Sequence, residues 1–304
     1  MSVGVIMPVH GPAPYLFEAL DAVLAQQPPP DEVIIVDDGS REAIVLDRVH
    51  AAAGRLVRRE RRGGPGPARD TALSVLHTDL VACADADDVW LPGKLAAQID
   101  ALARHPEVAV SFGSALIVGP DGEPTGEEWE TLPAGVLTRD FLAPLLFDHN
   151  PIPTSSVIAR REAVNAAGGF SGPPVGEDWA LWLRLLTRGE RFLFEPGAVI
   201  KYRRHEGGAT ADIAALAESA FVIHETHRAL VDERARRRVK AADLTALARG
   251  RVRQRRYAAA RHALAAAAEL SPPSLRERAL RAALAVPVLR AGLGRRDPYR
   301  RRKP

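Results

Sequence analysis

The sequence predicts an α/β fold in which a mostly parallel sheet is flanked by helices and followed by a C-terminal helical extension. In the first third of the chain, short apolar runs typical of buried strands alternate with segments of helical periodicity. This alternation indicates parallel βαβ units with right-handed crossovers. The runs are apolar at almost every position, as expected where both faces of a sheet are covered. From Ala211 onward the chain is rich in alanine and arginine at helical spacing.

The first hundred residues contain the clearest alternation. Apolar runs predict strands at residues 3–7, 32–36, 55–58 and 80–84. Helical spacing predicts helices at residues 15–26, at residues 68–76 and from about residue 92. The three prolines at 28–30 end the first of these helices, because proline cannot continue a helix.

The pattern changes after about residue 105. Strands are predicted at residues 108–112, 115–118, 154–158 and 191–202. Helices are predicted at residues 138–146, 161–167 and 177–187, and the acidic residues 126–132 predict a loop. We therefore expect a first domain over residues 1–210, a helical extension over 211–294 and a basic, disordered tail over 295–304.

Charge is distributed unevenly along the chain, although its net value is only +3. Residues 249–304 contain 16 Lys or Arg and 3 Asp or Glu, whereas the first 248 residues contain 25 and 35. Such a basic segment either forms solvated helix faces or binds an anionic membrane, an acidic partner or nucleic acid. Nucleic acid is the least supported, because Tyr257 and Tyr299 offer little aromatic surface for base stacking.

The composition is that of a soluble globular protein, with 46% hydrophobic and 26% charged residues. There is no run of 18 apolar residues to predict a membrane-spanning helix, and the N-terminus lacks the basic region of a signal peptide. Cys83 is the one cysteine, so no internal disulfide is possible. We expect a cytoplasmic protein, with the basic tail available for peripheral contact at the inner face of the membrane.

Asp85-Ala86-Asp87-Asp88 directly follows the apolar run at residues 80–84. Three carboxylates at the carboxyl end of a strand repel one another unless a cation or polar ligand shares the site. Ligands of open α/β sheets bind at this end, and cations such as Mg²⁺ take carboxylate oxygens and bridge to phosphates. Asp85 and Asp87 are two residues apart and can face the same way. The alternative is a loop whose aspartates bond local N–H groups or cap the next helix.

Polar clusters also follow the other predicted strands. His10 follows the first strand, and residues 37–40 (Asp-Asp-Gly-Ser) follow the second, as a site for ribose or base hydrogen bonds or as an ordinary Asx-turn. The glycine-rich loop at 63–67 opens a helix, whose N-terminus favours phosphate, and Arg69 adds a permanent charge one turn later. Because these clusters fall at one edge of the predicted sheet, they predict one ligand site.

Six motifs occur in a specific order: Pro8-Val9, Val36-Asp37-Asp38-Gly39-Ser40, Gly63-Gly64-Pro65 with Ala68-Arg69, Asp85-Ala86-Asp87-Asp88, Gly168-Gly169-Phe170 and Glu177-Asp178-Trp179. Together they resemble the family 2 glycosyltransferases over residues 2–210. The resemblance implies a Rossmann-like GT-A fold, with a nucleotide-binding half at 1–105 and an acceptor-binding half at 106–210. It also implies an inverting enzyme that moves a sugar from a nucleotide-diphosphate sugar to an acceptor hydroxyl.

The resemblance implies which residues meet the nucleotide. Pro8 and His10 would border the base, and Asp38 and Arg69 would contact its polar edge. UDP and dTDP donors are favoured over GDP. This chain departs from the family pattern at three positions, because His10 stands where tyrosine is frequent and Arg62 and Asp70 replace asparagines. The identity of the base is therefore left open.

The resemblance also implies a divalent cation, Mg²⁺ or Mn²⁺. Asp85 would contact the ribose or the metal, Asp87 would bind the metal, and Asp88 would support the loop or the donor sugar. His205, in the loop after the predicted strand at 191–202, would reach the metal or the diphosphate. The alternative for His205 is a surface histidine in a mobile loop.

The general base is assigned by the same resemblance to Asp178. Inversion by direct displacement needs a group that takes the acceptor hydroxyl's proton as the nucleoside diphosphate leaves. From the residues alone, Glu177 and Asp178 could simply stabilise the helix dipole. Trp179 either belongs to the core or stacks on a sugar, and Trp182 continues the apolar stripe, which predicts a core position.

Two other functions stay open. Sugar-nucleotide pyrophosphorylases share a similar architecture, but their glycine-rich start is replaced here by residues 8–13 (Pro-Val-His-Gly-Pro-Ala). The second is a non-catalytic nucleotide-sugar-binding protein, which the presence of Asp85, Asp87 and Asp178 disfavours. The expected acceptor is a hydroxyl-bearing glycan, lipid-linked molecule or small molecule, as in polysaccharide or glycoconjugate biosynthesis.

Overall fold

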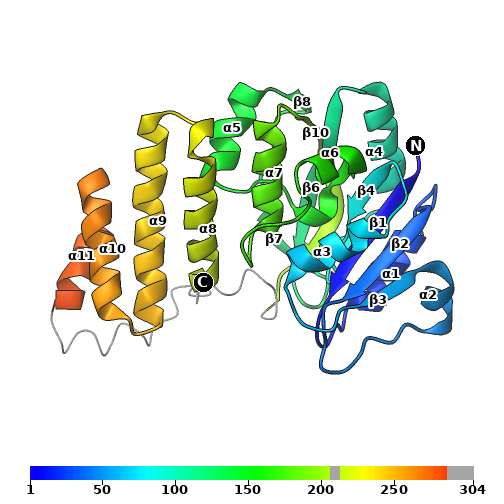
Figure 1. The fold of residues 1–304 in the computed structure, drawn as a ribbon, viewed down its shortest axis with the longest axis horizontal. Helices are drawn as coiled ribbons and strands as arrows, with labels where there is room; N and C mark the ends of the chain where they lie inside the picture. The colour runs from blue at the N-terminus through cyan, green and yellow to red at the C-terminus, as the bar shows by residue number, and fades with distance from the viewer. Residues whose placement is uncertain (206–212, 286–304) are drawn as a thin grey trace. The chain divides into compact units, whose positions relative to one another are not determined.

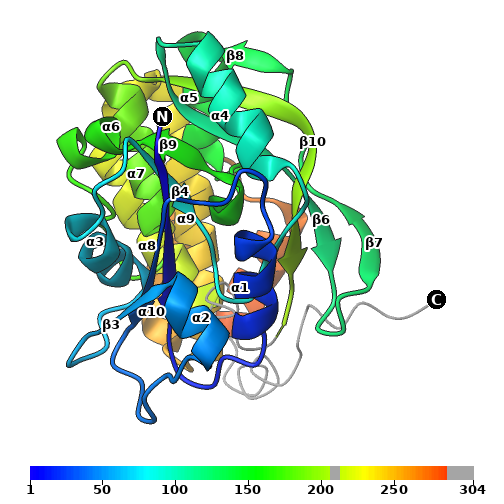
Figure 2. The same cartoon turned by 90° about the vertical axis from the view of Figure 1, so that its right-hand side faces the viewer.

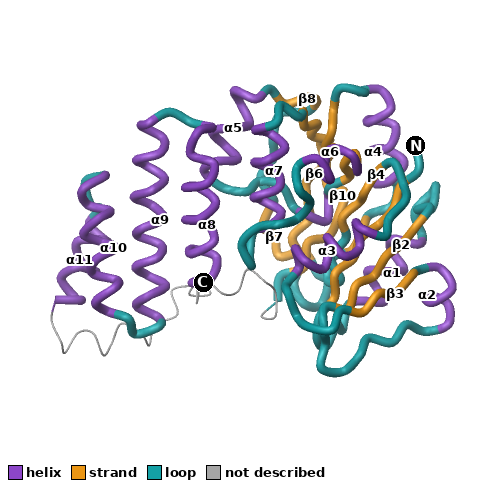
Figure 3. The backbone as a smooth tube through the Cα atoms, viewed as in Figure 1, coloured by secondary structure: helices purple, strands orange, loops and turns teal. Residues whose placement is uncertain are grey.

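The structure is a computed structural model that describes residues 1–205 and 213–285. The chain divides into two compact units, Met1–Gly208 and Ala209–Pro304. Strands and helices are mixed in the described part of the first unit, whereas the described part of the second is helical (Figure 3). The tail predicted at residues 295–304 lies outside the described residues. No described helix has both the length and the apolar composition needed to span a bilayer.

The first unit is built on a sheet of ten strands (Figure 1). They are β1 (Val3–Val9), β2 (Glu32–Asp37), β3 (Arg55–Arg58), β4 (Leu80–Cys83), β5 (Val89–Trp90), β6 (Val108–Val118), β7 (Pro124–Glu128), β8 (Gly135–Leu137), β9 (Ile158–Arg160) and β10 (Arg191–Arg203). Their order is β3-β2-β1-β4-β9-β6-β10-β5, with β7 on β6 and β8 on β10. Strands β1 to β4 pair in parallel, as do β6 and β10, and the other pairs are antiparallel.

Helices cover both faces of this sheet. They are α1 (Leu16–Leu24), α2 (Arg48–Ala53), α3 (Pro65–Ser74), α4 (Lys94–Arg104), α5 (Arg139–Asp148), α6 (Arg161–Ala166), α7 (Glu177–Thr187) and the 3₁₀ turn η1 (Thr154–Ser156). Figure 2 shows α1 and α4 on one side of the strands and α3, α6 and α7 on the other. Alternate β1 residues such as Val5 and Met7 pack against α1 and α4. Because helices cover both faces, the central strands are apolar throughout.

The second unit consists of α8 (Ile213–His227), the 3₁₀ turn η3 (Arg228–Leu230), α9 (Glu233–Arg253), α10 (Tyr257–Leu270) and α11 (Leu275–Ala285). Successive helices pack against each other. The contact of α9 with α10 and α11 combines the small side chains of Ala248, Ala260 and Ala263 with larger ones such as Leu264 and Leu284. Asp232 caps α9 by accepting the Ala235 N–H at 2.7 Å.

Two predicted elements differ from the structure. Residues 154–158, predicted as one strand, form η1 followed by β9, because the N–H of Ser156 bonds to the O of Pro153 at 2.9 Å and curls the backbone. Residues 126–132, predicted as a loop, begin within β7, an exposed edge strand that pairs with β6 alone. An edge strand of this kind carries few apolar residues, so its sequence resembles a loop.

Three further details follow from local sequence. The strands predicted at 108–112 and 115–118 are one strand, β6, which continues through Gly113. Strands β5 and β8 are two and three residues long and were not predicted. They are too short to show the alternation of apolar and polar residues by which a strand is predicted from sequence.

Candidate active site

The ends of β1 and β2 hold a polar turn. Asp38, 2% exposed, accepts hydrogen bonds from the backbone N–H groups of Gly63 and Gly64, the latter at 2.7 Å. Arg59 Nη1 donates to the same carboxylate at 2.7 Å. The exposed His10 places Nδ1 3.0 Å from the backbone O of Asp38. Asp38 therefore fixes the glycine loop that opens α3, and His10 stands beside it.

Arg69 in α3 joins two carboxylates across the site. Its guanidinium, 4% exposed, donates to Asp85 through Nη2 and to Glu177 through Nη1. Residue 66 must be small for this approach, since a Cβ on Gly66 would lie 2.9 Å from Cγ of Glu177. Burial acts to lower the pKa of Arg69, but the charges of Asp85 and Glu177 raise it. Burial raises the pKa of Glu177 to about 7, against the opposing effect of Arg69.

Asp85–Asp88 forms a turn after β4, in which the N–H of Asp88 donates to the O of Asp85 at 3.2 Å. Asp88 is 3% exposed and accepts the backbone N–H of Arg203 at 3.0 Å, so it supports the turn, which is one of the two roles expected of it. Burial and the adjacent Asp85 and Asp87 raise the pKa of Asp88 well above its usual range. Asp87 is partly exposed, with Oδ2 2.8 Å from Nε2 of His205. Burial and Asp85 raise the pKa of Asp87, and His205 opposes this.

Arg203, at the end of β10, holds this turn in place. Its Nε donates to the backbone O of Asp87 at 3.0 Å, and its Nη2 donates to Glu18 at 2.7 Å. The guanidinium carbon lies 4.3 Å from the centre of the Tyr15 ring, which in turn meets the ring of His205 at 5.5 Å. Sequence reasoning missed this role. The available signal was an arginine one residue past the predicted end of a strand.

Asp178 is the second residue of α7, and Gly176 is the N-cap of this helix. Gly176 has a φ of +83°, a left-handed conformation that glycine adopts without strain and that starts the helix here. Asp178 Oδ2 accepts hydrogen bonds from Asn150 Nδ2 at 3.2 Å and from Thr154 Oγ1. Asp178 is thus held by neutral donors, whereas the neighbouring Glu177 is held by Arg69.

The turn η1 connects both parts of the site. Thr154 bonds to Asp178, and the next residue, Ser155, accepts the backbone N–H of Asp85 on its Oγ at 3.0 Å. Ser155 is 1% exposed. One short turn therefore fixes the candidate base relative to the acidic turn. The sequence predicted a strand at residues 154–158 and no role for Asn150. The contacts of Asn150 and Thr154 with Asp178 join residues far apart in the chain, so no pattern in the local sequence indicates them.

The two tryptophans of α7 belong to the core. Trp182 is 0% exposed, which confirms its predicted position. Trp179 is 7% exposed and its Nε1 donates to the O of Leu146 at 2.6 Å, so its ring is not available to stack on a sugar.

Of the three predicted metal ligands, Asp87 and His205 are in contact, whereas Asp85 is bonded to Arg69. Among residues 1–205 and 213–285, no group of three or more His, Cys, Asp or Glu side chains has a ready metal geometry. Asp87 and His205 meet at 2.8 Å, while one oxygen of Asp85 is bound to Arg69. Carboxylates with one imidazole suit Mn²⁺ or Mg²⁺. A divalent ion could bind Asp87 Oδ2 and His205 Nε2, the two atoms that now contact each other. The chemistry of these residues therefore fits a divalent ion.

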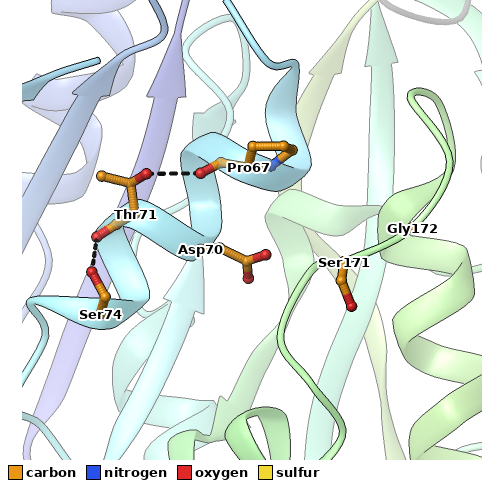
Figure 4. A pocket seen from close by; sticks show the side chains of 6 residues that line it. All are labelled: Pro67, Asp70, Thr71, Ser74, Ser171 and Gly172. Carbon is orange, nitrogen blue, oxygen red and sulfur yellow. Dashed lines mark hydrogen bonds between the residues drawn. The ribbon is translucent and has the colours of Figure 1, made fainter. Parts of the chain in front are cut away.

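A cavity of about 540 Å³ lies on the outer face of α3, lined by Pro67, Asp70, Thr71, Ser74, Ser171 and Gly172. Figure 4 shows that the Thr71 and Ser74 hydroxyls are bonded to carbonyl groups of α3 itself. Asp70 accepts the N–H of Phe170 at 2.6 Å. These polar groups serve the fold, and they lie on the side of α3 away from the buried Arg69. This cavity is therefore not the candidate active site.

Comparison with known proteins supports the family resemblance. An uncharacterized protein of Mycobacterium tuberculosis is 32% identical over 201 residues, which cover 64% of this chain and 56% of that protein. The amylovoran biosynthesis glycosyltransferase AmsE of Erwinia amylovora is 27% identical over 192 residues, 62% of this chain and 70% of that protein. This chain thus spans little more than half the length of its mycobacterial relative.

Solved structures support the fold. Residues 1–349 of S. aureus TarS align over 97% of this chain and 88% of that chain, with a TM-score of 0.58 and 17% identity. The mannosyltransferase PcManGT from Pyrobaculum calidifontis, in complex with GDP-Man and Mn²⁺, aligns over 96% of this chain and 82% of that chain, with a TM-score of 0.56 and 23% identity. These likenesses confirm the predicted α/β fold of GT-A type.

The family model described as Glycosyl transferase family 2 matches residues 4–167. The match contains Arg69 and Asp85–Asp88, and it ends before Asp178 and His205. Because it covers more than half of the chain, and because the predicted motifs meet at one edge of the sheet, this protein belongs to glycosyl transferase family 2.

Proposed function

We propose that the protein transfers a sugar from a nucleotide-diphosphate sugar to an acceptor hydroxyl, with inversion of configuration and with Asp178 as the general base. The observation that carries this proposal is the arrangement around η1. Thr154 bonds to Asp178 and the adjacent Ser155 bonds to Asp85, so a proton acceptor and the acidic turn share one support. Direct displacement needs these two groups in a fixed relation.

In the proposed reaction, the acceptor oxygen forms a bond to the anomeric carbon while the bond from that carbon to the diphosphate oxygen breaks. The bonding electrons leave with the nucleoside diphosphate, and the acceptor proton passes to Asp178. Asn150 and Thr154 orient the Asp178 carboxylate for this step. Glu177 is the weaker candidate, because Arg69 already occupies its carboxylate. A divalent ion held by Asp85, Asp87 and His205 would neutralise charge on the leaving diphosphate.

For the donor we propose UDP or dTDP ahead of GDP as the nucleotide. TarS has been solved with UDP-GlcNAc and with UDP, and PcManGT with GDP-Man. Pro8 lies in β1 and the exposed His10 follows that strand, which suits both residues to border a base. Asp38 is already bonded to the glycine loop, and Arg69 is already bonded to Asp85. We therefore propose that Asp38 positions the glycine loop, and Arg69 positions Asp85, for contact with the nucleotide.

Two alternatives are less well supported. Membership in glycosyl transferase family 2 favours transfer over the chemistry of a sugar-nucleotide pyrophosphorylase. The presence of Asp85, Asp87 and Asp178 favours an enzyme over a non-catalytic binding protein. The acceptor would carry a hydroxyl on a glycan, a lipid-linked molecule or a small molecule.

The helical extension suggests a location. Residues 213–285 contain 15 Lys or Arg and 7 Asp or Glu. We propose a cytoplasmic protein whose basic extension contacts the anionic inner face of the membrane. Sedimentation with phosphatidylglycerol vesicles, but not with phosphatidylcholine vesicles, would support this contact, and equal sedimentation with both would refute it.

Donor cleavage by the purified protein tests the proposed function. The protein is incubated with UDP-, dTDP- and GDP-sugars, with Mn²⁺ or with EDTA, and release of nucleoside diphosphate is measured. We expect one nucleotide class to be cleaved and EDTA to stop the reaction. Proton NMR of the product should show an anomeric configuration opposite to that of the donor. Retention would refute inversion, and failure to bind or cleave any of these donors would refute the proposed function.

A further inference from the structure

A second cavity, of about 200 Å³, lies in the first unit next to residues of the candidate active site. It is lined by Ile117, Trp129, Glu130, Asn150, Pro151 and Arg204. These residues come from the end of β6, the segment after β7, the segment before η1 and the segment after β10. The cavity is smaller than the pockets of about 300–1,000 Å³ that hold drug-sized ligands. Its size suits a single small ring.

Two lining residues connect this cavity to the candidate active site. Asn150 donates to Asp178 at 3.2 Å. Arg204 directly precedes His205, which meets Asp87 at 2.8 Å, and the N–H of Arg204 is fixed to the O of Val118 at 2.9 Å. A molecule in the cavity would therefore contact one residue bonded to the candidate base and another next to a candidate metal ligand.

One lining residue of the cavity, Trp129, is an aromatic side chain held in place. Trp129 Nε1 donates to the O of Pro151 at 2.8 Å, and the indole ring packs edge-on against Tyr202, with 5.0 Å between ring centres. Pro151 is buried and Ile117 is 3% exposed. An indole held at two points presents a preorganised apolar surface, on which the apolar face of a sugar ring can lie.

The charges around the cavity disfavour an anionic ligand. The two basic groups at its edge are already paired with carboxylates, Arg204 with Glu127 and His149 with Glu130. Asp178 adds a further carboxylate beyond Asn150. A phosphate brought here would find no unpaired cation in the cavity lining and would face like charges. The amide of Asn150 and the carboxylate of Glu130 can instead bond to hydroxyl groups.

We propose that this cavity is the acceptor site and that it receives one uncharged sugar ring of a glycan acceptor, stacked on Trp129 with its reacting hydroxyl toward Asp178. The inference rests on the proposed function, because it uses Asp178 as the base. The transfer is the displacement described above: the ring hydroxyl loses its proton to Asp178, its oxygen bonds to the anomeric carbon, and the diphosphate leaves. The cavity thus selects the acceptor, whereas the acidic turn selects the donor.

An acceptor panel tests this site. Initial rates are measured with the donor found above, Mn²⁺, and either methyl hexopyranosides or the same sugars as 6-phosphates. We expect transfer to uncharged glycosides and at least tenfold lower kcat/KM for the phosphates. Preference for a phosphorylated acceptor would overturn the inference, as would donor cleavage without transfer to any sugar. Absence of donor binding and cleavage would instead count against the proposed function.

Two variants locate the site. Trp129→Ala should raise the KM for the acceptor about tenfold while the Kd for the donor, measured by thermal shift, stays the same. Phe141→Ala removes an exposed aromatic ring outside the cavity and serves as the control. Glu130→Lys changes an exposed residue and should improve kcat/KM for 6-phosphates relative to uncharged sugars. If Trp129→Ala does not fold, the Glu130→Lys result decides, and an unchanged acceptor preference in that variant refutes the site.

Discussion

The two sides of the candidate site hold their polar groups by different means. On the side built from residues 1–105, Asp38 is bound by backbone N–H groups and an arginine, and the buried Arg69 bridges carboxylates. On the side built from residues 106–205, Asp178 is bound by an amide and a hydroxyl. The charged groups of the first side are paired with one another or with Glu177, whereas Asp178 on the second side is oriented by neutral groups.

This difference has an energetic consequence. Removing one member of a buried ion pair leaves its partner charged and unpaired, which costs more than the pair contributes. Removing one neutral donor from Asp178 costs less, because this carboxylate is partly exposed to water and keeps its other donor. We therefore expect substitutions on the nucleotide side to lower stability, and substitutions around Asp178 to lower the reaction rate.

Asp178→Asn is expected to have the largest effect. Loss of the general base should lower kcat about 10³-fold, and donor binding in the presence of Mn²⁺ should stay within twofold of the wild type. Asp87→Asn should also stop transfer, but it should weaken metal-dependent donor binding. Asp140→Asn, in the exposed first turn of α5, is the control. Near-normal turnover by Asp178→Asn would show that another group takes the proton.

Arg69→Met should unfold the protein at lower denaturant concentration. The substitution leaves Glu177 and Asp85 without their cation, and we expect the free energy of unfolding to fall by about 3–5 kcal/mol. Arg104→Met breaks the exposed pair with Asp100 at 2.9 Å and should cost no more than about 1 kcal/mol. The double variant Arg69→Met/Glu177→Gln should recover part of the loss. If Arg69→Met and Arg104→Met lower the free energy of unfolding by equal amounts, the buried ion pairs do not contribute differently from the exposed pair.

Lys94→Met tests a buried cation without a pairing carboxylate. Lys94 is 2% exposed, its Nζ has no hydrogen-bond partner among the described residues, and it lies 4.1 Å from the centre of the Trp90 ring. Burial lowers the pKa of Lys94 to about 7. At pH 7 the variant should therefore be more stable than the wild type, by about 4 kcal/mol, since each unit of pKa shift corresponds to about 1.4 kcal/mol.

The sign of the pH dependence follows from the same shift. Between pH 7 and the ordinary lysine pKa of 10.5, the unfolded chain binds the proton that the folded chain has lost. The free energy of unfolding of the wild type should therefore rise with pH in this range, and the full penalty should apply below pH 7. Chemical denaturation at several pH values should show a flatter curve for Lys94→Met. An identical slope in both proteins would mean that Lys94 is not the group that titrates.

The smallest expected effects separate the two neighbours in η1. Thr154→Val removes a donor to Asp178 and should lower kcat about tenfold with little change in donor Kd. Ser155→Ala removes the acceptor for the Asp85 N–H and should raise the donor Kd with a smaller change in kcat. Stopped-flow binding and steady-state rates distinguish these outcomes. If both variants change the same parameter, η1 does not connect two functionally different sides.

Local patterns were sufficient for much of the fold and part of the site. The apolar run of β4 followed by three aspartates located the acidic turn, and the periodicity of α7 gave its bounds of Glu177–Thr187. The same patterns did not reveal Arg203, because its contact with the Asp87 backbone joins residues 116 positions apart. A residue that acts through a distant backbone carbonyl leaves no periodic signal in its own segment.

The sequence by itself determined the order of the longer strands and helices, the charged character of the acidic turn and the family to which the chain belongs. Burial of apolar runs and repulsion between neighbouring carboxylates are local properties, and both can be read along the chain. The tertiary structure alone decided that Arg69 pairs with Asp85 and Glu177, and that η1 supports both Asp178 and Asp85. Pairing depends on distance in space, and only folding brings residues 69, 85, 155 and 178 within hydrogen-bond range of their partners.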